Sequence, residues 1–489
     1  MDWLLLGPEL WIGGLAALVL TLDLMWQGKR HSTLGLISAI GLLPALPLLL
    51  WQKSLCTTEL FGGLYRIDPT ALFFKTIFIA TAIIVVLITR ELSNSFEQGH
   101  DSEITSGAAS SSGSHGEFYL LILAATLGML FTASAGNFLM LFVSLELITI
   151  SFYVMTAYLK ADSRSLEAGL KYLILGSIAS GCFLYGIAYL YGATGSLQFS
   201  DIRAAIQQAP LSPGCFFGLL LILAGILFKT AVVPFHLWVP DVYEGAPTPV
   251  TAFLSVGSKS AGFLVALRVL IELFLPANAQ WTWLLMWLAG LTILYGNLGA
   301  IPQTNIKRLF GYSSIGHAGY ILIGIAAASS IGSTAVLFYL GGYLVTNLAA
   351  FLVIAAFSKQ AGSDQMSDYA GLSRRSPFLA AVMFLSLLSL AGVPPLVGFF
   401  GKFLLLASAV SKGYLGLAIV GAAAVVISLY YYLVLVKTMY IDPPTDSTPV
   451  SVTLSVKIAL AACAAGMLGI GICQSPFLQL SFSTIKTFF

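Results

Sequence analysis

The chain has 489 residues, of which 58% are hydrophobic and only 9% are charged. Soluble domains carry about 25% charged residues, so this composition excludes an ordinary soluble protein and indicates a polytopic membrane protein. The formal net charge of +2, without any basic tract, argues against nucleic-acid binding.

A membrane-crossing helix needs about 20 predominantly apolar residues. By this criterion the sequence predicts an all-α polytopic membrane protein with about 14 transmembrane helices. The predicted segments are 3–26, 33–52, 70–90, 118–134, 137–159, 166–191, 214–235, 248–274, 281–300, 306–328, 333–357, 378–409, 414–437 and 453–474.

The connecting segments predict the orientation. Eleven Lys and Arg residues lie in the loops after odd-numbered predicted helices, and five lie in the other loops. Cytoplasmic loops are enriched in Lys and Arg, so we expect both termini on the periplasmic side of a bacterial inner membrane. A Ser/Gly-rich stretch at 93–117 predicts a flexible loop, and 193–213 and 359–377 have room for short surface helices.

Charged side chains inside the apolar segments are the candidate functional residues. They are Glu146, Lys171, Lys229, Lys259 and Lys402, each in a different predicted helix. A charge at bilayer depth costs a few kcal/mol even on lenient insertion scales. Five of them in separate helices indicate a path for a mobile charge, and a proton fits because Lys and Glu both gain and lose one.

Some of these residues, and several further charged or polar ones, can also be interpreted as structural. Lys171 is close enough to the cytoplasmic end of its segment to reach the membrane surface. His317, in YSSIGHAGY, is either a sixth path residue or a hydrogen-bonded core histidine. Lys75, Arg268 and Glu272 lie near segment ends, where anchoring at the membrane surface is the better interpretation.

Prolines interrupt two of the predicted helices. Pro234 follows Lys229 in the segment 214–235, and Pro394-Pro395 precedes Lys402 in the segment 378–409. Discontinuous helices at corresponding places indicate an internal transporter repeat. We therefore expect two inverted five-helix repeats, each with a broken helix. The expected division is 1–117 (three helices and the loop), 118–275 (first repeat), 276–437 (second repeat) and 438–489 (C-terminal helix).

Several motifs carry a resemblance to a known family. VVPFHLWVPDVYEGAPTPVTAFLSVGSKSAGF, LFVSLELITISFYVM, EAGLKYLILGSIASG, NIKRLFGYSSIGHAGY and SLAGVPPLVGFFGKF cover most of the chain. They are similar to the proton-translocating, antiporter-like subunits of respiratory complex I, the type I NADH:quinone oxidoreductase. The sequences around Lys171 and Glu146 resemble subunit N more than subunits L or M, and the long lateral helix that marks subunit L is not seen in this sequence.

The resemblance implies a role for each residue. Glu146 is expected to pair with Lys229, and Lys259 to link two half-channels along the bilayer midplane. His317 is expected to bridge Lys259 and Lys402, and Lys402 to connect onward to the second half or to the neighbouring subunit.

The resemblance also implies what lies elsewhere in the complex. NADH, FMN, the iron–sulfur clusters and quinone are expected in partner subunits, so no cofactor is expected here. The five cysteines form no CxxC or other ligand spacing, which predicts no metal site. The expected partners are the K-like and M-like membrane neighbours, the lateral helix of the L-like subunit, and the lipid bilayer.

The resemblance makes the chain a subunit of a translocase whose redox sites are on other subunits. One alternative is a subunit of a multisubunit Na⁺/H⁺ antiporter or membrane-bound hydrogenase, which share the fold and the lysines. Another is a membrane scaffold that pumps nothing, although a scaffold has no use for buried lysines. A solute transporter is less favoured, because no aromatic or carboxylate cluster defines a substrate.

Overall fold

The computed structural model describes residues 5–26, 31–53, 58–98, 115–208, 211–444, 448–486 and 488–489. Most of the Ser/Gly-rich loop and Cys56 therefore lie outside the described residues. Within the described ranges, thirteen helices are long and apolar enough to cross a membrane. Two shorter apolar helices, α17 (Pro377–Ala391) and α18 (Val397–Ser411), form the halves of one further predicted segment. The prediction of a nearly all-helical protein with about 14 membrane helices is confirmed.

The N-terminal part contains four helices and a small hairpin. The helices are α1 (Gly7–Trp26), α2 (His31–Leu42), α3 (Ala45–Lys53) and α4 (Pro69–Gln98). Together α2 and α3 form one predicted membrane segment, interrupted near Pro44. Strands β1 (Thr58–Leu60) and β2 (Tyr65–Ile67) pair antiparallel between α3 and α4. This hairpin is an addition to the all-helical prediction, because three-residue strands leave little periodic signal.

The next five helices build the side of the molecule that holds Glu146 and Lys229. They are α5 (His115–Ala133), α6 (Phe138–Thr156), α7 (Ser163–Thr194), α8 (Phe199–Gln208) and α9 (Pro213–Thr230). The predicted boundary between α5 and α6 is real, because the Asn137 side chain accepts from the Met140 N–H and caps α6. The short helix predicted within 193–213 is α8.

Both proline interruptions break their helices. After α9, the chain leaves helical geometry at Ala231, passes Pro234 and resumes as α10 (Trp238–Gly245). Helix α17 likewise ends at Ala391 and is capped by Gly392 with φ +88°, and α18 begins beyond Pro394-Pro395. Proline has no N–H to donate, so neither segment can continue its hydrogen-bond ladder through the break.

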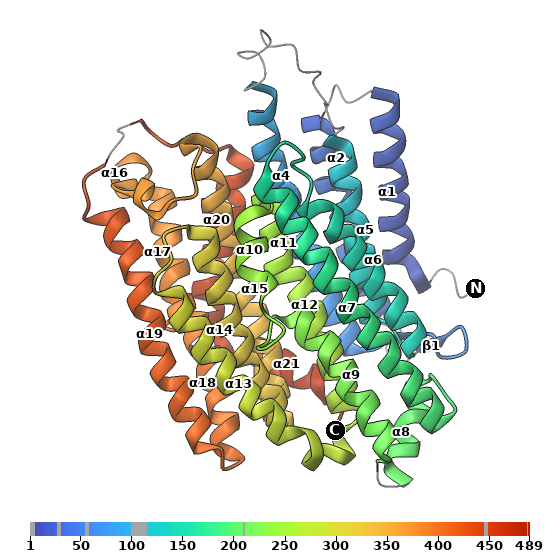
Figure 1. Cartoon of the computed structure of the whole chain (residues 1–489). Coiled ribbons are helices and arrows are strands. Elements are labelled where there is room, and N and C mark those ends of the chain that lie inside the picture. The colour runs from blue at the N-terminus through green and yellow to red at the C-terminus, as the bar shows by residue number, and fades with distance from the viewer. Residues whose placement is uncertain are drawn as a thin grey trace.

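The core of the bundle is formed by the three membrane spans that are most completely buried. The first consists of α11 (Thr248–Phe253), the π-helix η2 (Leu254–Ser258), α12 (Lys259–Ala266) and the π-helix η3 (Leu267–Leu273), and it is wholly buried. The others are α14 (Ile306–Ala326) and α15 (Ser330–Ala361), both almost entirely buried. Figure 1 shows these helices in the middle, with α1, α2 and α5 on one flank and α17 and α19 on the other.

The remaining elements complete the second half of the chain. They are the 3₁₀ turn η4 (Leu275–Ala277), α13 (Asn278–Ala300), the 3₁₀ turn η5 (Met366–Tyr369), α16 (Leu372–Arg375), α19 (Leu415–Tyr440), α20 (Leu454–Ile472) and α21 (Gln474–Ile485). The turn η5 and α16 are the short helices predicted within 359–377. The division into two inverted repeats and the four predicted domain boundaries stay predictions.

Candidate functional site

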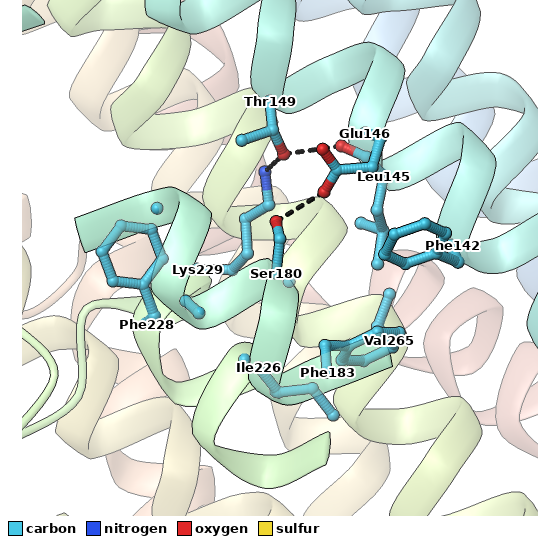
Figure 2. A pocket seen from close by; sticks show the side chains of 14 residues that line it. Phe142, Leu145, Glu146, Thr149, Ser180, Phe183, Ile226, Phe228, Lys229 and Val265 are labelled. Carbon is cyan, nitrogen blue, oxygen red and sulfur yellow. Dashed lines mark hydrogen bonds between the residues drawn. The ribbon is translucent and has the colours of Figure 1, made fainter. Parts of the chain in front are cut away.

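Glu146 and Lys229 line the same pocket between α6, α7, α9 and α12 (Figure 2). The Glu146 carboxylate accepts a hydrogen bond from Ser180 on α7 at 2.5 Å. The Lys229 ammonium donates to the hydroxyl of Thr149, three residues beyond Glu146 on α6. Between these two described side chains the structure contains no direct ion pair. Glu146 and Lys229 thus share a pocket, but each is hydrogen bonded to a hydroxyl group and not to the other.

Lys229 and Lys259 lie on helices that pack closely. A Cβ on Gly262 would lie 2.9 Å from the Thr230 Cγ2 and 3.1 Å from the Lys229 Cβ, so α12 packs tightly against α9 at this glycine. Gly262 is about one helical turn beyond Lys259. The packing therefore places the helical turn that follows Lys259 directly against Lys229.

Lys259 is held by the next core helix. Its side chain is buried and its ammonium donates to the carbonyl of Ser314 on α14 at 2.7 Å, and also to the Ser314 hydroxyl. The Ser314 hydroxyl lies 3.1 Å from the hydroxyl of Tyr243 on α10. Lys259 directly follows the π-helix η2, and π-turns inside α-helices often occur at functional sites.

His317 is also buried on α14, one turn beyond Ser313. Its Nδ1 lies 2.5 Å from the hydroxyl of Tyr339 on α15, and its Nε2 lies 3.3 Å from that of Tyr432 on α19. The hydroxyls of Tyr432 and Ser313 are hydrogen bonded to each other. Among the described residues, no hydrogen bond joins His317 to Lys259 or Lys402, so the expected bridge between the two lysines stays a prediction.

Lys402 is buried on α18 beside the second helix break. Its ammonium donates to the carbonyl of Ala391, the last residue of α17, at 3.1 Å. It also lies 4.9 Å from the ring centroid of Tyr320, which is one turn beyond His317 on α14. Lys402 therefore contacts both the broken end of α17 and the helix that carries His317.

Lys171 stands apart from the other predicted residues. Its side chain is 40% exposed and its ammonium pairs with Glu167 on α7 and Asp241 on α10, at 2.7 and 2.6 Å. It contacts none of Glu146, Lys229 or Lys259.

Sequence reasoning missed the tyrosines that contact His317 and Ser314. These are Tyr243, Tyr339 and Tyr432. Tyrosine is a common core residue, and in a linear sequence only its place in an apolar segment distinguishes it. Their proximity to His317 and Ser314 depends on helices far apart in the chain, so no local pattern reveals it.

Lys75, Arg268 and Glu272, which were expected to anchor their helices at the membrane surface, lie in the interior of the bundle instead. Lys75 is completely buried and pairs with Glu9 on α1 at 2.7 Å, while donating to the Tyr65 hydroxyl at 2.8 Å. Anchoring at the surface is therefore wrong for this lysine. The hairpin next to α4 supplies the tyrosine, which the sequence analysis did not predict.

Arg268 and Glu272 belong to a second buried cluster. Arg268 donates to both carboxylate oxygens of Asp68, at 2.6 and 3.0 Å. Glu272 accepts from both terminal nitrogens of Arg66, at 2.5 and 2.9 Å, and from Nη1 of Arg268 at 3.2 Å. Burial alone would raise the pKa of Asp68, but the charges of Arg268 and Arg66, with the hydrogen bonds from Arg268 and the Ala71 N–H, together outweigh burial and hold it below its ordinary value. The cluster joins the hairpin to η3.

No group of three or more His, Cys, Asp or Glu side chains that could bind a metal ion occurs among the described residues.

Comparisons with known proteins show the family to which the chain belongs. Residues 135–428 match the family model of the NADH:quinone oxidoreductase/Mrp antiporter transmembrane domain. NADH-quinone oxidoreductase subunit N of Moorella thermoacetica is 40% identical over 99% of this chain and 98% of its own length. Subunit N of Heliobacterium modesticaldum is 39% identical over the full length of both chains.

Two solved structures have the same fold as this chain. A chain of respiratory complex I from Thermus thermophilus is 31% identical, with a TM-score of 0.79 over 97% of this chain and 99% of that one. A chain of the Mrp complex from Dietzia sp. is 20% identical, with a TM-score of 0.85 over 98% and 97% of the two chains. The second likeness shows only the fold.

Proposed function

The chain belongs to the family of NADH-quinone oxidoreductase N subunits, and we propose that it moves protons across the membrane through its buried Glu/Lys/His chain. The path residues are Glu146, Lys229, Lys259, His317 and Lys402. The redox reaction takes place in partner subunits and supplies the energy. This subunit of the translocase moves the protons.

One observation carries the proposal. The wholly buried part of the bundle contains polar groups in contact with one another: Lys259 with Ser314, Ser314 with Tyr243, and His317 with Tyr339 and Tyr432. A hydroxyl both donates and accepts hydrogen bonds, so it can pass a proton on without carrying a lasting charge. A purely structural core would be more stable with apolar side chains at these positions.

The contacts also support an order. The first part is the pocket of Glu146 and Lys229, whose hydroxyl neighbours are Ser180 and Thr149. The close packing of α9 and α12 leads from Lys229 to Lys259. From there the polar groups of α14 lead towards Lys402, which lies over the Tyr320 ring beside the second break.

The setting of the subunit is part of the proposal. The Lys and Arg bias of the loops supports a bacterial inner membrane with both termini on the periplasmic side. The K-like and M-like subunits are its membrane neighbours, with the lateral helix of the L-like subunit alongside. NADH, FMN, iron–sulfur clusters and quinone bind to other subunits.

The test is Lys259→Met in the intact complex, because methionine keeps most of the side-chain volume without the charge. NADH-driven acidification of inverted membrane vesicles is measured at matched complex content. We expect a loss of about tenfold or more, the scale of a positioned proton-transfer group. The control is Lys457→Met at the exposed start of α20, which should pump normally. Normal pumping by Lys259→Met would favour a non-pumping scaffold.

A Na⁺/H⁺ antiporter subunit is the second candidate, since the Dietzia Mrp chain has the same fold. The same vesicles distinguish the two. Proton movement that depends on NADH and is unchanged without Na⁺ supports the complex I role, whereas a requirement for Na⁺ supports the antiporter.

A further inference from the structure

A cluster of charged side chains surrounds α10, the helix that follows the first break. The Lys171 ammonium on α7 contacts Asp241 on α10 at 2.6 Å. Arg308, near the start of α14, contacts the other Asp241 oxygen at 2.7 Å and Glu244 at 3.0 Å. We call Lys171, Asp241, Glu244 and Arg308 the α10 clamp. Through Asp241, the clamp joins α7 to α14.

Lys171 does not behave as a lysine that merely extends to the membrane surface. Such a lysine places its ammonium in water or among lipid headgroups. The Lys171 side chain is 40% exposed, but its ammonium also lies within 2.7 Å of two carboxylates, Glu167 on its own helix and Asp241 on another. Asp241 also binds Arg308, so the positions of Lys171, Asp241 and Arg308 depend on one another.

The backbone around α10 is held closely as well. At the end of α10, a Cβ on Gly245 would approach the Arg164 carbonyl oxygen to 2.4 Å, so α10 and the start of α7 are in near contact. Lys307 donates to the carbonyl of Ala246, the next residue, at 3.1 Å and pairs with Asp364 at 3.0 Å. Any displacement of α10 would therefore break several polar contacts together.

The place of α10 in the chain connects it to the path. The preceding helix, α9, carries Lys229 one residue before its end, and residues 231–237 lead into α10. Only Ala246 and Pro247 separate α10 from the span that carries Lys259. The Tyr243 hydroxyl of α10 itself contacts Ser314, the partner of Lys259. The position of α10 therefore affects where Tyr243 and Ser314, which lie beside Lys259, are placed relative to Lys229.

We propose that Lys171 is a positioning residue rather than a proton carrier: through Asp241 it fixes α10 between α7 and α14 and so holds the Lys229 and Lys259 sites in register. This inference rests on the proposed function, because it assigns a role within the same path. It differs from the sequence-based expectation, which placed Lys171 in the path itself.

The test compares four variants in the intact complex. Lys171→Met and Asp241→Asn each remove one half of the pair, and Lys171→Arg keeps the charge without the ability to release a proton. Glu167→Gln is the matched control, because Glu167 contacts the same ammonium but does not lead to α10. Complex content and thermal unfolding temperature are measured beside the rate of NADH-driven acidification of inverted vesicles.

We expect Lys171→Met and Asp241→Asn to lower pumping on the order of tenfold, since a misplacement of about 1 Å can cost up to about 100-fold in rate. The unfolding temperature should stay near wild type, and the double variant should be no worse than either single one. Lys171→Arg and Glu167→Gln should both pump normally.

Two results would overturn the inference. Normal pumping by Lys171→Met would remove Lys171 from the mechanism. Loss of pumping in Lys171→Arg as large as in Lys171→Met would make Lys171 a proton carrier. Lys259→Met, run in parallel, keeps the two proposals separate: if it pumps normally the proposed function fails, whereas if it is inactive and Lys171→Met is normal, only the positioning role fails.

Discussion

The ammonium of Lys229 on α9 donates a hydrogen bond to the hydroxyl of Thr149 on α6. Thr149 lies one helical turn from Glu146, whose carboxylate is held by Ser180 instead. The acid and the base of this pocket are therefore separated by hydroxyl groups, and each can change its protonation state without first breaking an ion pair. This arrangement suits a relay better than a fixed salt bridge would, because a lasting ion pair stabilises both charges where they are.

The relay predicts that Lys229→Ala and Glu146→Ala both lower NADH-driven proton pumping and coupled NADH:quinone turnover by about tenfold or more. The complex should still assemble, because neither variant leaves behind the partner of a direct buried ion pair. Acidification of inverted vesicles and complex content on native gels measure the two effects. Normal pumping in assembled Lys229→Ala membranes would remove the pair from the path.

Thr149→Val tests the hydroxyl link with almost no change of shape. A hydrogen bond to a charged group contributes about 1.5–3 kcal/mol, so we expect pumping to fall about tenfold. The matched control is Thr230→Val, beside Lys229, because the Thr230 hydroxyl donates only to carbonyls of its own helix. Equal pumping by the two variants would show that the Thr149 hydroxyl plays no part.

Lys402 distinguishes a proton carrier from a fixed positive charge. Lys402→Met should impair pumping, because methionine keeps the packing against Tyr320 but has no proton to release. Lys402→Arg keeps the charge but cannot lose a proton at accessible pH, so it should not restore pumping. Both are compared in inverted vesicles at matched complex content. Full activity in Lys402→Arg would make Lys402 a fixed charge, and full activity in both would exclude it from the path.

Asp68→Asn should destabilise the subunit rather than stop pumping directly. It removes the carboxylate that binds Arg268 through two hydrogen bonds, and breaking a buried pair in this way costs about 3–5 kcal/mol. The thermal unfolding temperature of the purified complex measures the loss. Glu59→Gln, at an exposed position of β1, is the control and should leave that temperature unchanged.

The same pair gives a pH dependence with a definite sign. The pKa of Asp68 in the folded protein lies below its ordinary value because of Arg268, although burial opposes this. The stabilisation is therefore fully present above the unfolded pKa of about 4, and it is lost as the pH falls through the lower folded value. Wild-type and Asp68→Asn unfolding temperatures should converge below that range; a constant difference at all pH values would contradict this origin.

The amino-acid sequence by itself determined the membrane class, the helix count and the two broken helices. These features depend on local runs of apolar residues and on proline, which acts wherever it stands. It also identified the ionisable residues within apolar segments, because Glu146, Lys229, Lys259 and Lys402 interrupt segments that are visible without any partner.

Only the tertiary structure decided what each of these residues contacts. Lys259 and Ser314 are 55 residues apart, and Asp68 and Arg268 are 200 apart, so their contacts follow from how the helices pack. Lys75 and Arg268 resemble surface anchors in the sequence but are buried with partners from other elements. Glu9 of α1 and the Tyr65 hydroxyl of β2 bind Lys75, and Asp68, between β2 and α4, binds Arg268. A local pattern fixes depth along one helix, whereas pairing depends on rotation and packing against other helices, which distant parts of the chain decide.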